Sequence, residues 1–162
     1  MIDRAADLRA EFDRGFAAPV VAADSAPVDL LLVRAGGVAY AIARTDITGL
    51  HADFAIVAMP TRAPELLGLA TIRNAVVPVY ALDRIVGSTH GEASPRWLVV
   101  THTVALAFEG FDGYRRVPNL PAAQSSGHLR GVIDIDGDTR PILDLDSVLA
   151  TITRRVPAAK ER

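Results

Sequence analysis

The sequence predicts a mostly β protein made of two pseudo-symmetric β-barrel subdomains, with short helices at its two ends. Short apolar runs alternate with Gly, Pro and Asp across residues 29–152, a pattern typical of short strands joined by turns. Residues 66–86 are repeated as residues 129–149 at a constant offset of 63 positions. A repeat unit of about sixty residues is too small to bury a full core alone, so the two copies should pack against each other.

The repeat needs no gap in either copy. The residues common to both copies are Leu66, Gly68, Ile72, Pro78, Leu82 and Asp83 in the first and Leu129, Gly131, Ile135, Pro141, Leu145 and Asp146 in the second. Upstream, the apolar runs at 31–33 and 38–42 resemble those at 98–100 and 104–108. Each copy is therefore predicted to contain, in order, a hairpin, a variable middle segment, a second pair of strands and a short helix at its end.

Residues 1–28 predict a helix followed by a linker. Ala5, Leu8, Phe12 and Phe16 recur at spacings of three and four, as on one face of a helix. This helix can pack on the barrels, bind a partner's groove or remain a partly ordered extension. Packing on its own domain is favoured, because two phenylalanine side chains are costly to leave in water.

The first strands are expected to form a hairpin. Apolar runs at 30–33 and 38–42 flank a Gly-Gly pair at 36–37, and glycine tolerates the positive φ that a tight turn requires. Further short strands are expected at 75–80, 97–100 and 140–143. Pro78 and Pro141 should lie on strand edges or bulges, because proline has no N–H for a sheet ladder.

Domain boundaries follow from the repeat. The expected division is an extension over 1–28, subdomain 1 over about 29–87, subdomain 2 over about 96–149 and a polar tail over 153–162. One helical turn is expected at 83–86 and a longer helix at 147–154.

Composition excludes several classes of function. The 162 residues include no cysteine, which excludes disulfides, thiolate metal sites and a cysteine nucleophile. A formal net charge of -2 argues against a general nucleic-acid binder. Because no apolar stretch is long enough to span a membrane and the first residues lack the features of a signal peptide, we expect a cytoplasmic protein without membrane insertion.

The sequence contains no recognisable catalytic or metal-binding pattern. No two of its histidines, at positions 51, 90, 102 and 128, lie three to five residues apart. The serine within 87–91 is not centred as a nucleophile turn requires. We therefore expect neither enzymatic activity nor a metal or other cofactor.

The order of these motifs resembles the CheW-like family, which includes the chemotaxis coupling protein CheW and the regulatory domain of the histidine kinase CheA. Residues 40–42 (Tyr-Ala-Ile) correspond to the second strand of the family's first hairpin. Residues 71–74 (Thr-Ile-Arg-Asn) resemble its Asn-Leu-Arg-Gly loop, and residues 78–82 (Pro-Val-Tyr-Ala-Leu) its proline-containing strand. Residues 111–117 and 142–145 match segments of its second half.

The resemblance implies a fold of two five-stranded, SH3-like barrels without enzymatic activity. It also implies an adaptor or scaffold in chemotaxis signal transduction that acts through protein–protein interaction. The implied partners are the regulatory domain of a CheA-type histidine kinase and the cytoplasmic tip of a chemoreceptor.

Six positions correspond to family segments implicated in partner contacts: Arg73, Ile72, Asn74, Ile47, Asp112 and Tyr114. Arg73 corresponds to the arginine of the family loop. Ile47 and Ile72 correspond to positions near the receptor groove, and Asp112 and Tyr114 to a second-barrel segment. Without the resemblance, Arg73 reads as a solvated turn residue.

The loop departs from the family pattern, which leaves alternatives open. Thr71 and Asn74 replace the usual Asn and Gly, and Ala81 replaces the usual Asp before Leu82. Asn tolerates a positive φ, so the turn should survive at Asn74. The departures favour, as one alternative, an accessory CheW-like protein of a motility or pilus pathway with altered partners. Another alternative is a small-molecule sensor or enzyme with a site between the two barrels.

Overall fold

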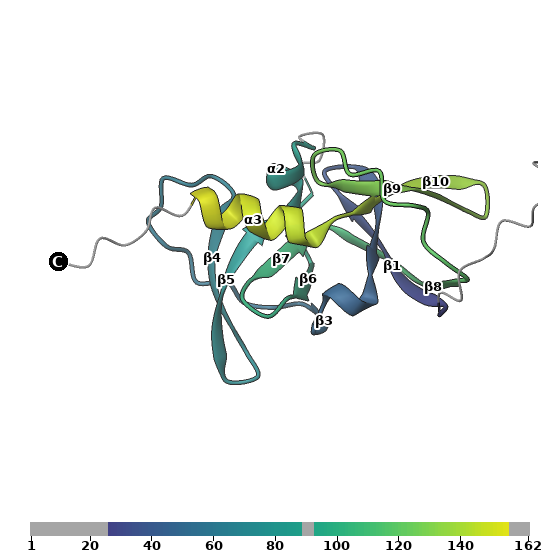
Figure 1. Ribbon diagram of the computed structural model, residues 1–162. Coiled ribbons are helices and arrows are strands. Elements are labelled where there is room, and N and C mark those ends of the chain that lie inside the picture. The colour runs from purple at the N-terminus through teal and green to yellow at the C-terminus, as the bar shows by residue number, and fades with distance from the viewer. Residues whose placement is uncertain (1–25, 89–92, 156–162) are drawn as a thin grey trace, which may run out of the picture.

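Ten strands and three helical segments form the described part of the chain, residues 26–88 and 93–155, in this computed structural model (Figure 1). The strands are β1 (Val28–Ala35), β2 (Val38–Ala43), β3 (Gly49–Ala52), β4 (Leu66–Ile72), β5 (Ala75–Ala81), β6 (Trp97–Val100), β7 (Ala105–Phe108), β8 (Gly110–Val117), β9 (Leu129–Ile135) and β10 (Asp138–Leu143). The helical segments are the 3-10 turn η1 (Arg44–Asp46), α2 (Leu82–Val86) and α3 (Leu145–Arg155). The helix predicted near the amino terminus falls in residues 1–25, outside the described residues.

The strands form two five-stranded sheets. Sheet A has the order β8-β1-β2-β10-β9, and sheet B has the order β3-β6-β7-β5-β4. Neighbouring strands are antiparallel except for the parallel pairs β2–β10 and β5–β7. The prediction of a mostly β fold with two five-stranded units is confirmed.

Each sheet takes strands from both copies of the repeat. Sheet A joins the β1–β2 hairpin of the first copy to β8, β9 and β10 of the second, and sheet B joins β6–β7 of the second copy to β3, β4 and β5 of the first. The strand order is the same in both sheets when every strand is replaced by its repeat equivalent. The expected subdomains at 29–87 and 96–149 thus describe the repeated sequence but not the sheets. A lone two-stranded hairpin is marginally stable, and each hairpin here gains its partners from the other copy.

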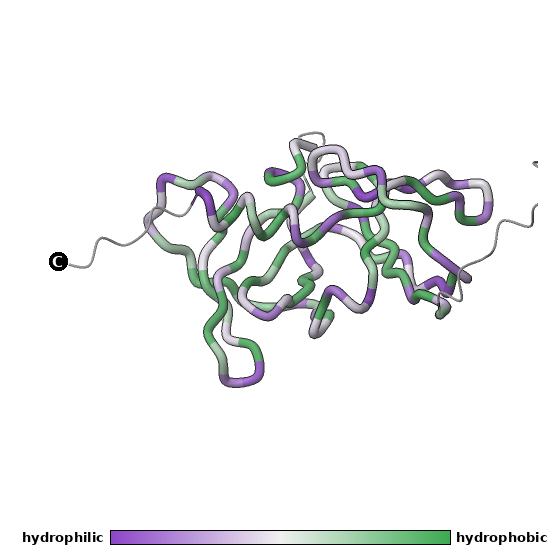
Figure 2. The backbone as a smooth tube through the Cα atoms, viewed as in Figure 1, coloured by the Kyte–Doolittle hydropathy of each residue, from purple (hydrophilic) through white to green (hydrophobic). Residues whose placement is uncertain are grey.

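Apolar residues from both sheets and both α-helices form the largest core cluster, while polar residues gather in the turns (Figure 2). Leu31 of β1 belongs to this cluster, whereas Leu30 and Leu32 on the other face of β1 belong to a smaller cluster within sheet A. A third cluster lies within sheet B and includes Val79 and Leu98. Because successive side chains of a strand point to opposite faces, β1 is buried on both sides and its sequence is a continuous apolar run.

Pro78 and Pro141 lie in strands that are inner in the sheet order, but at positions where the strand is paired on one side only. Both β5 and β10 have a neighbour on each side. Pro78 pairs with β4, and the parallel pairing of β5 with β7 begins only at the next residue, Val79. Pro141 pairs with β9, and β10 contacts β2 through Ile142. Each proline therefore lies where its strand has one partner rather than two, so its missing N–H interrupts no second ladder.

The helix α3 packs along the sheets at the end of the second copy (Figure 1). Leu145, Val148 and Ile152 are buried on one face, at the spacings of three and four typical of an amphipathic helix. The helix predicted at 147–154 is confirmed. The polar tail was expected from residue 153, but α3 continues to Arg155, whose guanidinium donates a hydrogen bond to Glu65.

Candidate partner-binding surface

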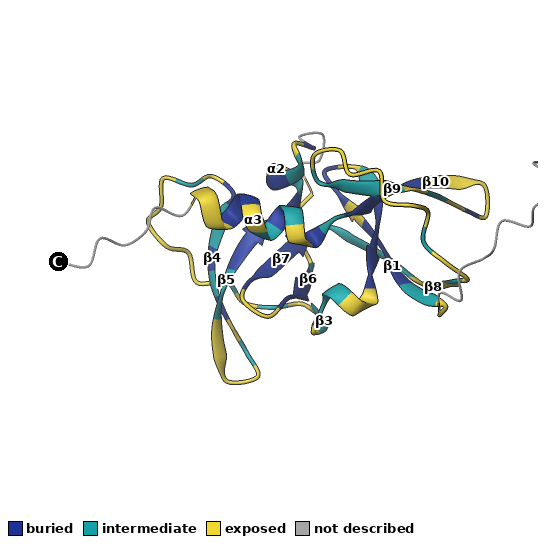
Figure 3. Ribbon diagram, in the orientation of Figure 1, coloured by how far each residue is buried: buried dark blue, intermediate teal, exposed yellow. Residues whose placement is uncertain are grey.

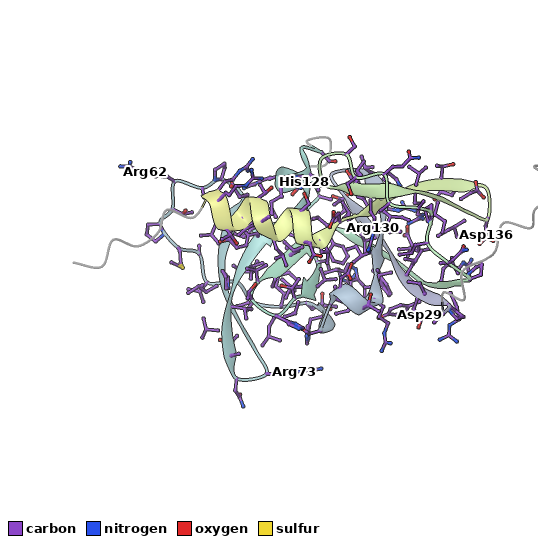
Figure 4. All side chains as sticks on the ribbon, in the orientation of Figure 1. Asp29, Arg62, Arg73, His128, Arg130 and Asp136 are labelled. Carbon is purple, nitrogen blue, oxygen red and sulfur yellow. The ribbon has the colours of Figure 1, made fainter. Side chains whose placement is uncertain are left out.

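The β4–β5 hairpin extends beyond the two sheets and carries Arg73 at its tip (Figure 4). Its turn consists of Arg73 and Asn74, with φ values of 48° and 64°. Two successive residues with positive φ are typical of a type I′ turn, whose twist matches that of the paired strands. The turn predicted at Asn74 is therefore present, and it places the Arg73 side chain in solvent.

One face of this hairpin is apolar and uncovered. Thr71 pairs with Val76, Leu69 pairs with Pro78, and Leu69 also bridges to Val57. Paired residues of neighbouring strands lie on the same side of a sheet, so these five side chains share a surface, called here the hairpin face. Val57 is 69% exposed and Val76 is 65% exposed, so apolar area is left in water (Figure 3). These two valines leave an exposed apolar patch on the hairpin face.

The opposite side of the hairpin faces the core of sheet B. Ala70 and Val79 are buried there, and Ile72 and Val77 pack against the same cluster as half-buried residues. Ile72, a candidate for partner contact, thus supports the hairpin from its inner side.

Ile47 lies elsewhere, between η1 and β3. It is half-buried and packs against the large cluster shared by the two sheets. The structure therefore brings Ile72, Arg73 and Asn74 together at the hairpin and holds Ile47 apart from them.

Asp112 and Tyr114 lie on β8, in the other sheet. Asp112 Oδ2 accepts hydrogen bonds from Arg34 Nε at 3.0 Å and from Arg140 Nη2 at 2.9 Å. Arg140 belongs to β10. The contact therefore joins the edge strand β8 to β10, which is separated from it in the sheet order by β1 and β2. Burial alone would raise the pKa of Asp112, but the hydrogen bonds from Arg140 and Arg34 hold the pKa below its ordinary value. Asp112 therefore has a structural role inside sheet A.

Tyr114 keeps a free surface. Its ring packs edge-on against Phe111, with centroids 5.2 Å apart, and the residue remains 52% exposed. Phe111 in turn packs on Trp97 of sheet B at 5.1 Å. The aromatic series links the two sheets and leaves Tyr114 at its outer end.

Sequence reasoning did not find the hairpin face. Val76 belongs to the apolar run at 75–80, which reads as a buried strand, and Val57 lies in an irregular segment. The one sequence feature that could have indicated this exposed face is Thr71, a polar residue near the end of an apolar run. In the structure Thr71 pairs with Val76.

A cavity of about 300 Å³ opens where the two sheets meet, and its charged lining groups are Asp83, Arg84 and Glu109. This volume is at the lower limit for small-molecule sites. Glu109 Oε1 already accepts a hydrogen bond from the backbone nitrogen of Gly37 at 2.7 Å. Across residues 26–88 and 93–155, no three acidic or histidine side chains gather as a metal site requires, and no helix is long and apolar enough to cross a membrane.

Comparison with protein families matches residues 29–153 to the CheW-like domain. The chain belongs to the CheW-like family. Among solved structures, it resembles the scaffolding protein CheW from Thermoanaerobacter tengcongensis, with a TM-score of 0.63 and 14% sequence identity over 72% of this chain and 88% of that protein. At this identity the likeness shows a shared fold. A search of curated proteins finds no match.

The Asp112 contact gives this CheW-like domain a testable pH dependence. Replacing Asp112 with asparagine should lower the free energy of unfolding at pH 7 by about 1–2 kcal/mol, because Arg140 is buried and loses a charged partner. The Asp112 pKa is lower in the folded than in the unfolded chain, so this stabilisation is present above the unfolded pKa and is lost as pH falls through the folded one. Urea denaturation of parent and variant should therefore show a gap that narrows below about pH 4.

A matched control is Asp136→Asn, which breaks the exposed ion pair of Asp136 with Arg115. It should change stability by less than about 1 kcal/mol. An Asp112→Asn gap that stays constant down to pH 2 would contradict the assignment.

Proposed function

We propose that this CheW-like protein is a non-catalytic adaptor that couples a chemoreceptor to a CheA-type histidine kinase. The observation that carries the proposal is the projecting β4–β5 hairpin, whose exposed apolar face lies beside Arg73, an arginine that forms no ion pair within the described part of the chain. The family supplies the class of partner, and the hairpin supplies a surface on which one can bind.

The hairpin combines two kinds of contact found in specific interfaces. Val57 and Val76 offer apolar area that a partner can remove from water, and Arg73 offers a charged group at its rim. No acidic side chain among the described residues forms an ion pair with Arg73. The guanidinium is therefore available to a partner carboxylate or carbonyl.

Reversing the charge at the hairpin tip should weaken partner binding. With Arg73→Glu, we expect the affinity for the kinase regulatory domain or the receptor tip to fall about tenfold, since a rim charge turns from attractive to repulsive. Val76→Ser should give a loss of similar size by removing apolar contact. Isothermal titration with each partner separately measures both effects and shows which partner the hairpin binds.

The control is Arg96→Glu, an equal charge change at an exposed arginine whose carboxylate partner is Asp53. Its affinities should equal those of the parent. If the parent binds neither partner at tens of micromolar, the proposal fails. If it instead binds only the kinase and receptor of a pilus or other motility pathway, the accessory role indicated by Thr71 and Asn74 replaces the main one.

A further inference from the structure

The carboxyl-terminal end of α3 lies beside several arginines, of which only Arg155 forms an ion pair with a described acidic residue. The described residues contain twelve arginines and no lysine, and seven of the arginines form ion pairs. Of the five that form none with a described acidic residue, three surround this end of the helix: Arg62, Arg84 and Arg154.

Two hollows adjoin at this place. The first, of about 670 Å³, is lined by Thr61, Arg62, Ala63, Pro64, Glu65 and Arg155. The second, of about 510 Å³, is lined by Gly127, His128, Ser147, Thr151, Arg154 and Arg155. Arg155 lines both hollows, so they are neighbours, and together they are called here the α3 groove.

The walls of the groove are held in place by internal contacts. Arg155 Nη1 donates to Glu65 Oε1 at 3.1 Å, and Glu65 is buried, so the one carboxylate in the lining is already neutralised. Arg84 of α2 donates to the carbonyl oxygen of Pro64 and so fixes the loop that carries Arg62. Arg62, Arg154 and Arg155 thus line hollows whose walls are held by contacts within the protein.

The electrostatic state of His128 is consistent with this excess of positive charge. Burial lowers its pKa, and the nearby charges of Arg155 and Arg154 lower it further, outweighing the opposite effect of Asp144. His128 Nδ1 lies 3.2 Å from Ser147 Oγ, which donates to the carbonyl oxygen of Gly127.

We propose that the α3 groove binds an acidic peptide segment of a partner protein. Arg62 lines one hollow and Arg154 the other, and an extended chain with several carboxylates can contact both. The cations line a depression rather than a flat face, which suits a peptide better than a lipid surface. Figure 4 shows Arg62 and Arg73 at opposite ends of sheet B, so this surface is distinct from the hairpin face.

The test uses the full chain and a fluorescein-labelled octaglutamate peptide, with octaglutamine as the neutral control. Fluorescence anisotropy should show that octaglutamate binds and octaglutamine does not. The affinity for octaglutamate should fall as the salt concentration rises. Arg62→Glu and Arg154→Glu should each weaken binding about fivefold, the size expected for loss of one exposed ion pair. Arg96→Glu, at a residue that lines neither hollow, should leave the affinity unchanged, and circular dichroism should confirm that every variant is folded.

Three results would overturn the proposal. One is equal octaglutamate affinity in the parent and in both groove variants. Another is capture of the parent by phosphatidylglycerol vesicles without any binding of octaglutamate, which would assign the arginines to a membrane surface. The third is displacement of octaglutamate by inorganic phosphate at equal concentration, which would indicate a single-anion site.

Discussion

Replacing Gly68 with alanine should destabilise the protein by more than about 4 kcal/mol, far more than Gly131→Ala at the equivalent position of the second repeat. Both glycines have positive φ, 147° and 159°, which side chains rarely allow. That strain alone costs about 1–3 kcal/mol. The two sites differ in what a Cβ atom would meet.

At Gly68 the added Cβ would lie 2.1 Å from the carbonyl oxygen of Val57, which is backbone and cannot rotate away. Relief of this clash requires Val57 to move, although Val57 and Leu69 exchange two backbone hydrogen bonds, of 2.7 and 2.9 Å. At Gly131 the nearest atom is Pro121 Cγ at 3.3 Å, on an exposed loop that can yield by a few tenths of an ångström.

Urea denaturation of the two variants measures the difference. Gly68→Ala should also disturb the hairpin face, because Val57 is part of it, and should weaken partner binding along with stability. Equal loss of stability in the two variants would show that the backbone strain at positive φ accounts for the whole cost of each substitution. The clash with the Val57 carbonyl oxygen would then contribute nothing.

Truncating a core leucine in either copy should lower the stability of the whole domain at once. Leu82 and Leu145 are repeat equivalents at the start of α2 and α3, and both are fully buried in the cluster shared by the two sheets. Each alanine variant should cost about 2–5 kcal/mol, from lost burial and the cavity left behind. Because each sheet contains strands of both copies, neither copy can unfold alone.

The single tryptophan makes this testable. Trp97 belongs to the second copy, whereas Leu82 belongs to the first. Leu82→Ala should nevertheless shift the urea midpoint of Trp97 fluorescence as much as that of far-ultraviolet circular dichroism, as a two-state transition requires. A Trp97 midpoint unchanged by Leu82→Ala would show two independently folding halves. Val132→Ala, at a residue 57% exposed, is the control and should shift neither.

Local elements of this fold were predictable from sequence because their signals are local. The two-residue turn at 73–74, the paired apolar runs and the periodicity of α3 depend on neighbours a few positions away. Pro78 predicts a position with no strand on its nitrogen side, as found, but it does not predict that β7 pairs with β5 from Val79 onward, because that pairing depends on tertiary packing.

The candidate surface was predictable only in part. Arg73 and Asn74 lie at an exposed tip, as a turn motif implies. Asp112 was expected to lie in a segment that contacts a partner, yet it accepts a hydrogen bond from Arg140, 28 positions away, within sheet A. Val76 reads as a core residue, since exposure depends on how far its hairpin extends past the sheets.

The sequence by itself determined the repeat, the strand and turn pattern and the apolar faces, because these follow from the chemistry and spacing of adjacent residues. Only the tertiary structure decided that the two copies exchange hairpins. Equivalent copies offer each hairpin equivalent strands to pair with, so the local pattern is satisfied either within a copy or between copies. The choice rests on which arrangement buries the shared core. That choice makes one cooperative domain from two repeats and leaves the β4–β5 hairpin and the α3 groove on its surface.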